Sequence, residues 1–205
     1  MLLLLFEVIP RAGRVDEYLG IAAELRPELD AMGGCLFIDR YRSLAEPRKF
    51  LSYQVWRDEA ALTRWRVHHA HHKAQALGRV RVFEDYRLRV AMVVRVESMG
   101  EPPWQAPHGS TWHDPEGTAP RYVAVAESDA GALDGAEESF ESIYRPGEFA
   151  HVIAGTAGRP AASLAEFPRA RRIRLAEIER DYGMHDRAEA PQYFAPVSSG
   201  PPPAS

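Results

Sequence analysis

The 205-residue sequence has one cysteine, no long apolar run and no block of like charges. Because Cys35 cannot form a disulfide within the chain, the composition is typical of a reducing compartment. No segment approaches the roughly 20 apolar residues that a membrane-spanning helix needs. The apolar start, Met1–Leu5, lacks the basic flank of a signal peptide. A net charge of −4 without charge runs favours neither nucleic acid nor a membrane surface as partner. We therefore expect a cytoplasmic protein.

One strand-like segment occurs twice in the chain, 85 residues apart. Residues 87–95 read Arg-Leu-Arg-Val-Ala-Met-Val-Val-Arg, and residues 172–180 read Arg-Ile-Arg-Leu-Ala-Glu-Ile-Glu-Arg. Both arginines that flank the first apolar residue, the central alanine and the final arginine are identical, and most other positions are conservative changes. Such self-similarity indicates a repeated structural unit of roughly 90 residues.

The first unit, residues 1–96, shows the pattern of a ferredoxin-like fold. Runs of apolar residues, alternation and helical spacing predict, in order, strand Leu2–Ile9, helix Val15–Met32, strands Cys35–Ser43 and Lys49–Trp56, a helix from Asp58 to about Leu77, and strand Val82–Val96. This order is β-α-β-β-α-β, with both helices on one face of the sheet. The other face needs a cover, most simply a second sheet.

The rest of the chain predicts a linker and a second, degenerate unit. Residues 97–120 are rich in proline and glycine, and Trp104 and Trp112 within them predict a linker packed on the surface. Residues 121–193 predict strand Arg121–Glu127, a short helix Asp129–Glu138, a hairpin of Phe140–Tyr144 and Phe149–Ala154, a helix Ala161–Ala170 and strand Arg172–Arg180. Helix propensity alone favours a helix over 161–182, whereas the repeat favours a strand. Residues 194–205 predict a mobile tail.

Several motifs of the first unit carry a resemblance to a known family. They are Leu51-Ser52-Tyr53-Gln54-Val55-Trp56-Arg57-Asp58-Glu59, Ala61-Leu62-Thr63-Arg64-Trp65-Arg66 and Phe83-Glu84-Asp85-Tyr86-Arg87-Leu88-Arg89-Val90. With them the first 96 residues resemble the antibiotic-biosynthesis monooxygenase family of dimeric α+β barrels. The resemblance implies an α+β fold in which two ferredoxin-like β-α-β-β-α-β units form an intramolecular, pseudo-dimeric barrel. It also implies a pocket between sheet and helices.

The resemblance further implies a monooxygenase-type oxidoreductase that acts on a small aromatic or polyketide-like substrate without a bound organic cofactor. Such chemistry needs a dry pocket, orienting donors and a group that accepts a proton. The alternatives are a heme-binding or heme-degrading protein and a non-catalytic small-molecule binding protein. Heme-degrading relatives carry an Asn on the first strand and an axial His ten residues after the helix tryptophan. Here the strand has Phe6 and Glu7, and residue 75 is Gln.

Trp65 and a histidine cluster on the second predicted helix are the candidate site. Trp65 and His71 match pocket positions of relatives, and His71 or His72 can exchange a proton because imidazole titrates near neutrality. The alternative is a tryptophan that fills the core beside solvated histidines. His68 and His72, at i and i+4, could share a metal ion, but no third ligand is evident, and we predict no metal.

The remaining candidates would bind substrate: Phe6, Glu7, Tyr53 and His68. Glu7 is either a buried carboxylate with a raised pKa, suited to act as a base, or a residue exposed at the end of a strand. The second unit lacks about 14 residues where the first carries its histidines. We therefore expect one working pocket, and a monomeric pseudo-dimer or a dimer of such barrels.

Overall fold

The computed structural model describes residues 1–106, 121–155 and 162–191. The first unit consists of β1 (Leu2–Pro10), α1 (Val15–Met32), β2 (Cys35–Ser43), β3 (Phe50–Trp56), α2 (Glu59–Val67), α3 (His69–Leu77), the π-helical turn η1 (Gly78–Val82) and β4 (Phe83–Ser98). The remainder consists of β5 (Trp104–Gln105), β6 (Tyr122–Ser128), β7 (Glu138–Ser142), β8 (Phe149–Gly155) and β9 (Ala170–Gly183). The predicted α+β class is confirmed.

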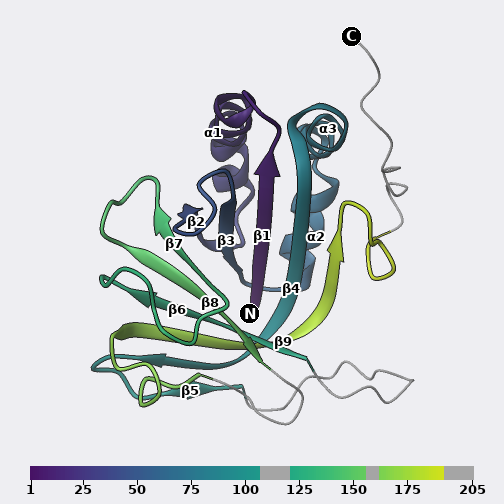
Figure 1. The fold of residues 1–205 in the computed structure, drawn as a ribbon. Helices are drawn as coiled ribbons and strands as arrows, with labels where there is room; N and C mark the ends of the chain where they lie inside the picture. The colour runs from purple at the N-terminus through teal and green to yellow at the C-terminus, as the bar shows by residue number, and fades with distance from the viewer. Residues whose placement is uncertain (107–120, 156–161, 192–205) are drawn as a thin grey trace.

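The strands form one antiparallel barrel. Their order is β1-β3-β2-β7-β8-β6-β9-β4, and β4 pairs with β1 to close the ring, while β5 pairs only with β4. The helices α1, α2 and α3 lie together behind β1 and β4 in Figure 1, on the outside of the first unit's strands. The barrel therefore has a central core and, under the helices, a second apolar layer. No helix within the described ranges is long and apolar enough to cross a membrane.

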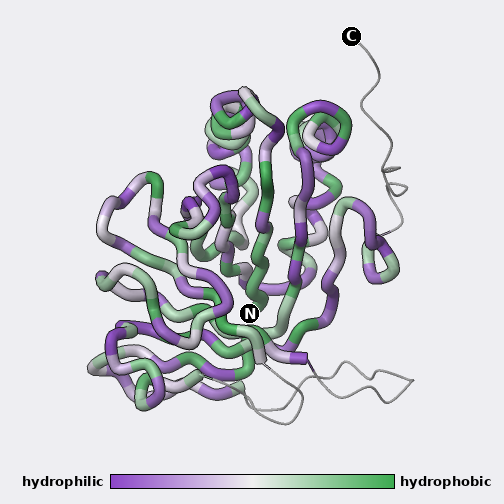
Figure 2. Tube along the Cα trace, viewed as in Figure 1, coloured by the Kyte–Doolittle hydropathy of each residue, from purple (hydrophilic) through white to green (hydrophobic). Residues whose placement is uncertain are grey.

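The first strand is apolar on both faces because both of its faces are buried. Leu3 and Leu5 pack in the barrel core, whereas Leu2 and Leu4 pack under the helices with Trp65. The hydropathy trace in Figure 2 shows this strand as a largely apolar segment beside the helices. Full burial on both sides explains why an apolar run, rather than an alternating pattern, predicts this strand.

The two units meet along two seams whose registers are reciprocal. Across the first seam Arg87 of β4 pairs with Gly183 of β9, and Ser98 pairs with Arg172. Since residue 172 is the repeat counterpart of 87, and 183 that of 98, each pairing is the mirror of the other. At the second seam Tyr41 pairs with Ser142 and Ser43 with Phe140. This reciprocity is the signature of a two-fold interface, here formed within one chain.

The prediction of two helices in the second unit is wrong for the residues that the structure describes. Residues 129–137 and 162–169 form bends and turns, which contradicts helices at Asp129–Glu138 and Ala161–Ala170. These stretches are too short for a stable helix, and glycine or proline interrupts them. Their apolar residues, among them Leu133 and Phe167, instead cover the outer face of the sheet. The ferredoxin-like pattern is thus complete only in the first unit.

The strand predicted at Arg172–Arg180 from the repeat is confirmed. It lies within β9, which pairs with β4 on one edge and with β6 on the other. Two ladders of hydrogen bonds outweigh the helix propensity of this arginine- and glutamate-rich segment, because propensity is a weak local preference that tertiary context overrides.

The single helix expected from Asp58 to about Leu77 is wrong in its continuity. The backbone of His68 is extended, with ψ of 131°, and separates α2 from α3. Gly78 does not end the helical path, which continues into η1.

In the linker, Trp104 is 43% exposed and pairs with β4, while Trp112 and residues 192–205 lie outside the described residues. The unit boundaries at residues 96 and 121 stay a prediction.

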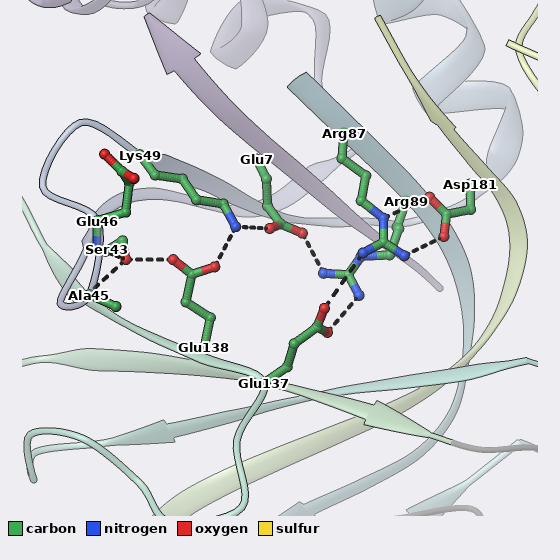
Figure 3. Close-up of polar contacts among 10 residues, drawn as sticks. All are labelled: Glu7, Ser43, Ala45, Glu46, Lys49, Arg87, Arg89, Glu137, Glu138 and Asp181. Carbon is green, nitrogen blue, oxygen red and sulfur yellow. Dashed lines mark hydrogen bonds and ion pairs between the residues drawn. The ribbon is translucent and has the colours of Figure 1, made fainter. Parts of the chain in front are cut away.

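Ion pairs lie inside the barrel at equivalent places of the two units. Arg89 binds Glu7, and its repeat counterpart Arg174 binds Glu127. Lys49 also binds Glu7, with its Nζ 2.7 Å from the carboxylate. Figure 3 shows how Arg89 and Lys49, the residue before β3, join Glu7 on β1 to Glu137 and Glu138 at the start of β7. The repeated arginines thus have a structural role, because each neutralises a carboxylate that would otherwise be buried alone.

The expectations for Glu7 need correction. Glu7 is 6% exposed, so it is not a solvent-facing strand end. Burial alone would raise its pKa, but Arg89 and Lys49 outweigh burial and lower it below its usual value. A carboxylate held ionised in this way is a poor proton acceptor.

We expect a monomer in solution, because both seams of the barrel are closed within the chain and a closed barrel leaves few strand edges to pair. Light scattering should give a mass near 23.0 kDa over a wide concentration range. A concentration-independent mass of twice that value would contradict the expectation.

A buried histidine in the second unit predicts acid sensitivity. His151 on β8 is fully buried between the hydroxyls of Ser128 and Ser139, at 2.7 and 2.8 Å. Burial, with a smaller effect of Arg169, lowers its pKa from 6.5 to about 4. The unfolded chain therefore binds a proton that the folded chain refuses, so stability falls as the pH drops from 6.5 towards 4. In urea titrations, His151→Gln should flatten this part of the profile. An unchanged profile would contradict the assignment.

Candidate active site

A cavity of about 190 Å³ lies between the helices and the outer face of the first unit's sheet. Its walls are mostly apolar and come from β1 to β4 and from α1 to η1. The end of β9 and the residues that follow it close the cavity, with Tyr182, Arg187 and Pro191 among the lining residues. An apolar cavity of about 150 Å³ can hold a benzene ring, so the space suits a small organic molecule.

Trp65 and His71 stand together in the wall of this cavity. Their rings are stacked, with centroids 4.4 Å apart and planes 16° from parallel. Nδ1 of His71 lies 3.0 Å from the carbonyl oxygen of Trp65 and 3.1 Å from Nε2 of Gln75. A carbonyl oxygen only accepts hydrogen bonds, so the contact with Trp65 assigns the proton to Nδ1. The amide nitrogen of Gln75 is itself a donor, so with this tautomer it lies beside Nδ1 without a hydrogen bond to it. Nε2 then carries the lone pair, and no described residue binds it.

Burial lowers the pKa of His71 from 6.5 to about 4, and the neighbouring His68 and His72 add to this effect, although the hydrogen bond to Trp65 opposes it. The imidazole is therefore neutral at physiological pH, which leaves Nε2 unprotonated, although the lowered pKa makes it a weaker base than a free histidine. Trp65 is 6% exposed and also belongs to the apolar cluster under the helices. It fills the core and lines the cavity at once, so the two alternatives drawn from the sequence do not exclude each other.

The structure places the seven candidate residues in three surroundings. Trp65, His71 and Phe6 line the cavity. His68 and His72 do not: His68 stacks on Trp65 and lies 3.4 Å from Glu28, and His72 is exposed.

Glu7 and Tyr53 lie on the opposite face of the sheet, inside the barrel. The hydroxyl of Tyr53 donates to Glu127 at 2.8 Å. Substrate contacts by these two residues are not supported, because alternation along a strand sends them away from the helices.

Sequence reasoning missed the polar residues of the cavity. Gln54 accepts a hydrogen bond from Nε1 of Trp56 at 2.9 Å and donates to Oγ of Ser52 at 3.0 Å. Near the other wall, the hydroxyl of Tyr86 accepts hydrogen bonds from Arg79 and Arg187. The alternation of β3 could have identified Ser52 and Gln54 as residues of the helix-facing side, but no sequence signal places Arg187 here.

The donor sets for a metal or a heme are limited. Among the described residues no group of three or more His, Cys, Asp and Glu side chains is arranged to hold a metal ion. Gln75, at the position of the axial ligand in heme-degrading relatives, donates to the carbonyl of Arg66 at 3.4 Å, and its Nε2 lies 3.1 Å from Nδ1 of His71. The volume of the cavity is also below the roughly 300–1,000 Å³ of pockets for drug-sized ligands, which favours a compact substrate over a tetrapyrrole.

Cys35 is partly exposed, and burial raises its pKa to about 11, so it is not a reactive thiolate.

The closed antiparallel barrel with helices over a lined cavity defines the class of single-chain, two-unit α+β barrels. The chain belongs to the antibiotic biosynthesis monooxygenase family: the family profile matches residues 1–77. A jasmonate monooxygenase of Pyricularia oryzae is 33% identical over 224 aligned positions, which span 97% of this chain and 100% of that protein.

Solved structures with low sequence identity also resemble the chain. A monooxygenase candidate from Fusobacterium nucleatum is 8% identical with a TM-score of 0.44, covering 86% of this chain and 90% of its own. One from Lactobacillus acidophilus is 10% identical with a TM-score of 0.42, covering 88% and 94%. The fold assignment rests on the strand pairing described above, not on these scores.

Proposed function

We propose that the protein is a monooxygenase that oxidises a small, compact substrate in the cavity beside His71 and Trp65, with no bound organic cofactor. The observation that carries the proposal is the neutral imidazole of His71, which lines a mostly apolar cavity and whose Nε2 has no partner among the described residues. Family membership and the jasmonate monooxygenase relative support an oxygenase rather than a passive binder.

The residues suit a reaction that starts with proton removal. Nε2 of His71 takes a proton from a CH₂ group beside a carbonyl or from the hydroxyl of a phenol, whose anion carries charge on a ring carbon, and this carbon reacts with O₂ to form a peroxide. His71 returns the proton to the peroxide, and loss of water leaves a carbonyl. The balance is R₂CH₂ + O₂ → R₂C=O + H₂O, with all four electrons supplied by the substrate. Exclusion of water by the apolar walls protects the intermediate from side reactions.

Oxygen consumption tests the proposal. Purified protein should consume O₂ with members of a panel of jasmonate, phenols and hydroquinones, and mass spectrometry with ¹⁸O₂ should find one labelled oxygen in the product. The assay runs with and without ascorbate, because hydroxylation of an unactivated carbon needs two electrons more than the substrate gives. Binding of panel members without any oxygen uptake would instead support the non-catalytic alternative, and a Soret band in the purified protein would support the heme alternative.

We expect one ligand per chain. In the second unit His151 takes the sheet position that Ser52 holds in the first. Its imidazole is fully buried there between the hydroxyls of Ser128 and Ser139. Isothermal titration should therefore give a stoichiometry of one. Two equivalent sites would contradict this.

A further inference from the structure

Three hydrogen-bond donors in the cavity wall lack an acceptor. Nε of Arg40 is a buried atom with no hydrogen-bond partner, and the buried hydroxyl of Tyr18 has no acceptor for its proton among the described residues. Ser52 is 2% exposed, and its oxygen accepts from Gln54, so its own proton has no acceptor among the described residues. Unsatisfied buried donors are rare and destabilising, and each calls for an explanation.

The three donors lie near one another. Arg40 on β2 is the direct register partner of Ser52 on β3, which brings their side chains onto the same face of adjacent strands. The guanidinium of Arg40 also lies close enough to the Tyr18 hydroxyl to lower its pKa through its charge and a hydrogen bond, although burial outweighs both effects. Burial raises the pKa of Tyr18, so the hydroxyl keeps its proton and remains a donor.

The electrostatic surroundings favour a negative group. None of the described residues that line the cavity is Asp or Glu, and Arg40 contributes a guanidinium to its wall. No described carboxylate lies within ion-pair distance of Arg40, and the neighbouring Asp39 is bound to Arg145 at 2.7 Å instead. Charge-assisted bonds from a guanidinium and hydroxyls are the arrangement that holds a carboxylate.

The donors lie away from the stacked pair. Tyr18 belongs to the apolar cluster of Val8, Phe50 and Val82, whereas Trp65 belongs to that of Leu2, Leu4 and Leu29. Phe6 packs against both clusters and lines the cavity between them. A ligand fixed at Tyr18 and Arg40 would therefore extend along an apolar wall towards His71.

We propose that Arg40, Ser52 and Tyr18 form a carboxylate-binding subsite, so that the substrate is a small apolar molecule with one carboxylate at the end remote from the oxidised carbon. The inference rests on the proposed function for the identity of the ligand as substrate, but the subsite itself is defined by binding. In the free protein these donors are unsatisfied, and the carboxylate of the bound ligand supplies the acceptor that they lack.

The test compares 3-phenylpropionate with its methyl ester by isothermal titration in the wild type, Arg40→Met, Tyr18→Phe and Arg26→Met. The wild type should bind the acid at least about tenfold more tightly than the ester, as expected for a charge-assisted hydrogen bond. Arg40→Met should abolish that preference and Tyr18→Phe should reduce it. The matched control Arg26→Met also alters a cavity arginine, but one already bound to Asp30 at 2.9 Å, and should keep the preference.

Melting temperatures separate a binding role from a structural one. Removal of an unsatisfied donor should leave the ligand-free protein as stable as the wild type or more stable. The subsite is refuted if neither probe binds the wild type, if acid and ester bind equally, or if Arg40→Met loses stability while keeping the preference. A protein that prefers the acid but never consumes oxygen refutes the oxygenase function alone. An active oxygenase without this preference refutes the subsite alone.

Discussion

Replacement of His71 should lower turnover by about 10²–10⁴, the usual contribution of a general acid or base. The expected loss follows from the free Nε2 of a neutral imidazole in the cavity wall. His71→Phe is the sharper variant, because its ring can still stack on Trp65 but has no nitrogen to accept a proton. Turnover is measured as substrate-dependent oxygen uptake, with circular dichroism and melting temperature as checks on the fold.

The control for this prediction is His69→Ala, which removes an exposed histidine of the same helix and should leave activity unchanged. An NMR titration of the histidine ring protons should give His71 a pKa of about 4. Wild-type turnover in His71→Phe would remove His71 from proton transfer. The stack on Trp65 would then be a packing contact only.

The buried ion pair between Arg89 and Glu7 should make Arg89→Met one of the most destabilising substitutions in the chain, at about 3–5 kcal/mol. Their side chains are 3% and 8% exposed, so the substitution leaves a carboxylate in the barrel with only Lys49 to neutralise it. Urea unfolding measures the loss. The exposed pair of Arg26 and Asp30 is the control, and Arg26→Met should cost less than about 1 kcal/mol.

The pH dependence of the same pair gives a second check. Because the pKa of Glu7 is lowered in the folded state, its contribution is complete above pH 4.5 and is lost as the pH falls below that value. Glu7→Gln should remove this part of the acid limb. If Arg89→Met unfolds at the wild-type urea concentration, the buried pair does not stabilise the barrel.

The internal repeat and the strand patterns predicted two ferredoxin-like units, and the family resemblance implied that they form a barrel. Alternation and apolar runs give the six main elements of the first unit, because the period of burial differs between strand and helix. The repeat at residues 172–180 correctly predicts a strand where local propensity favours a helix, since a copied segment inherits the pairing partners of the original. The missing helices of the second unit were not predicted, because the sequence records the shortened segments but not which residues replace the helices over the sheet.

The candidate site was only partly predictable. The sequence and its family resemblance identified Trp65 and His71 as pocket candidates, and the strand patterns indicated an apolar sheet beneath them. Tertiary structure decided the rest: the break at His68, the tautomer of His71, and the closure of the cavity by Tyr182 and Arg187 from the far end of the chain. Local patterns specify which face of an element is buried, whereas a cavity is made by side chains from distant elements, whose positions depend on how the barrel closes.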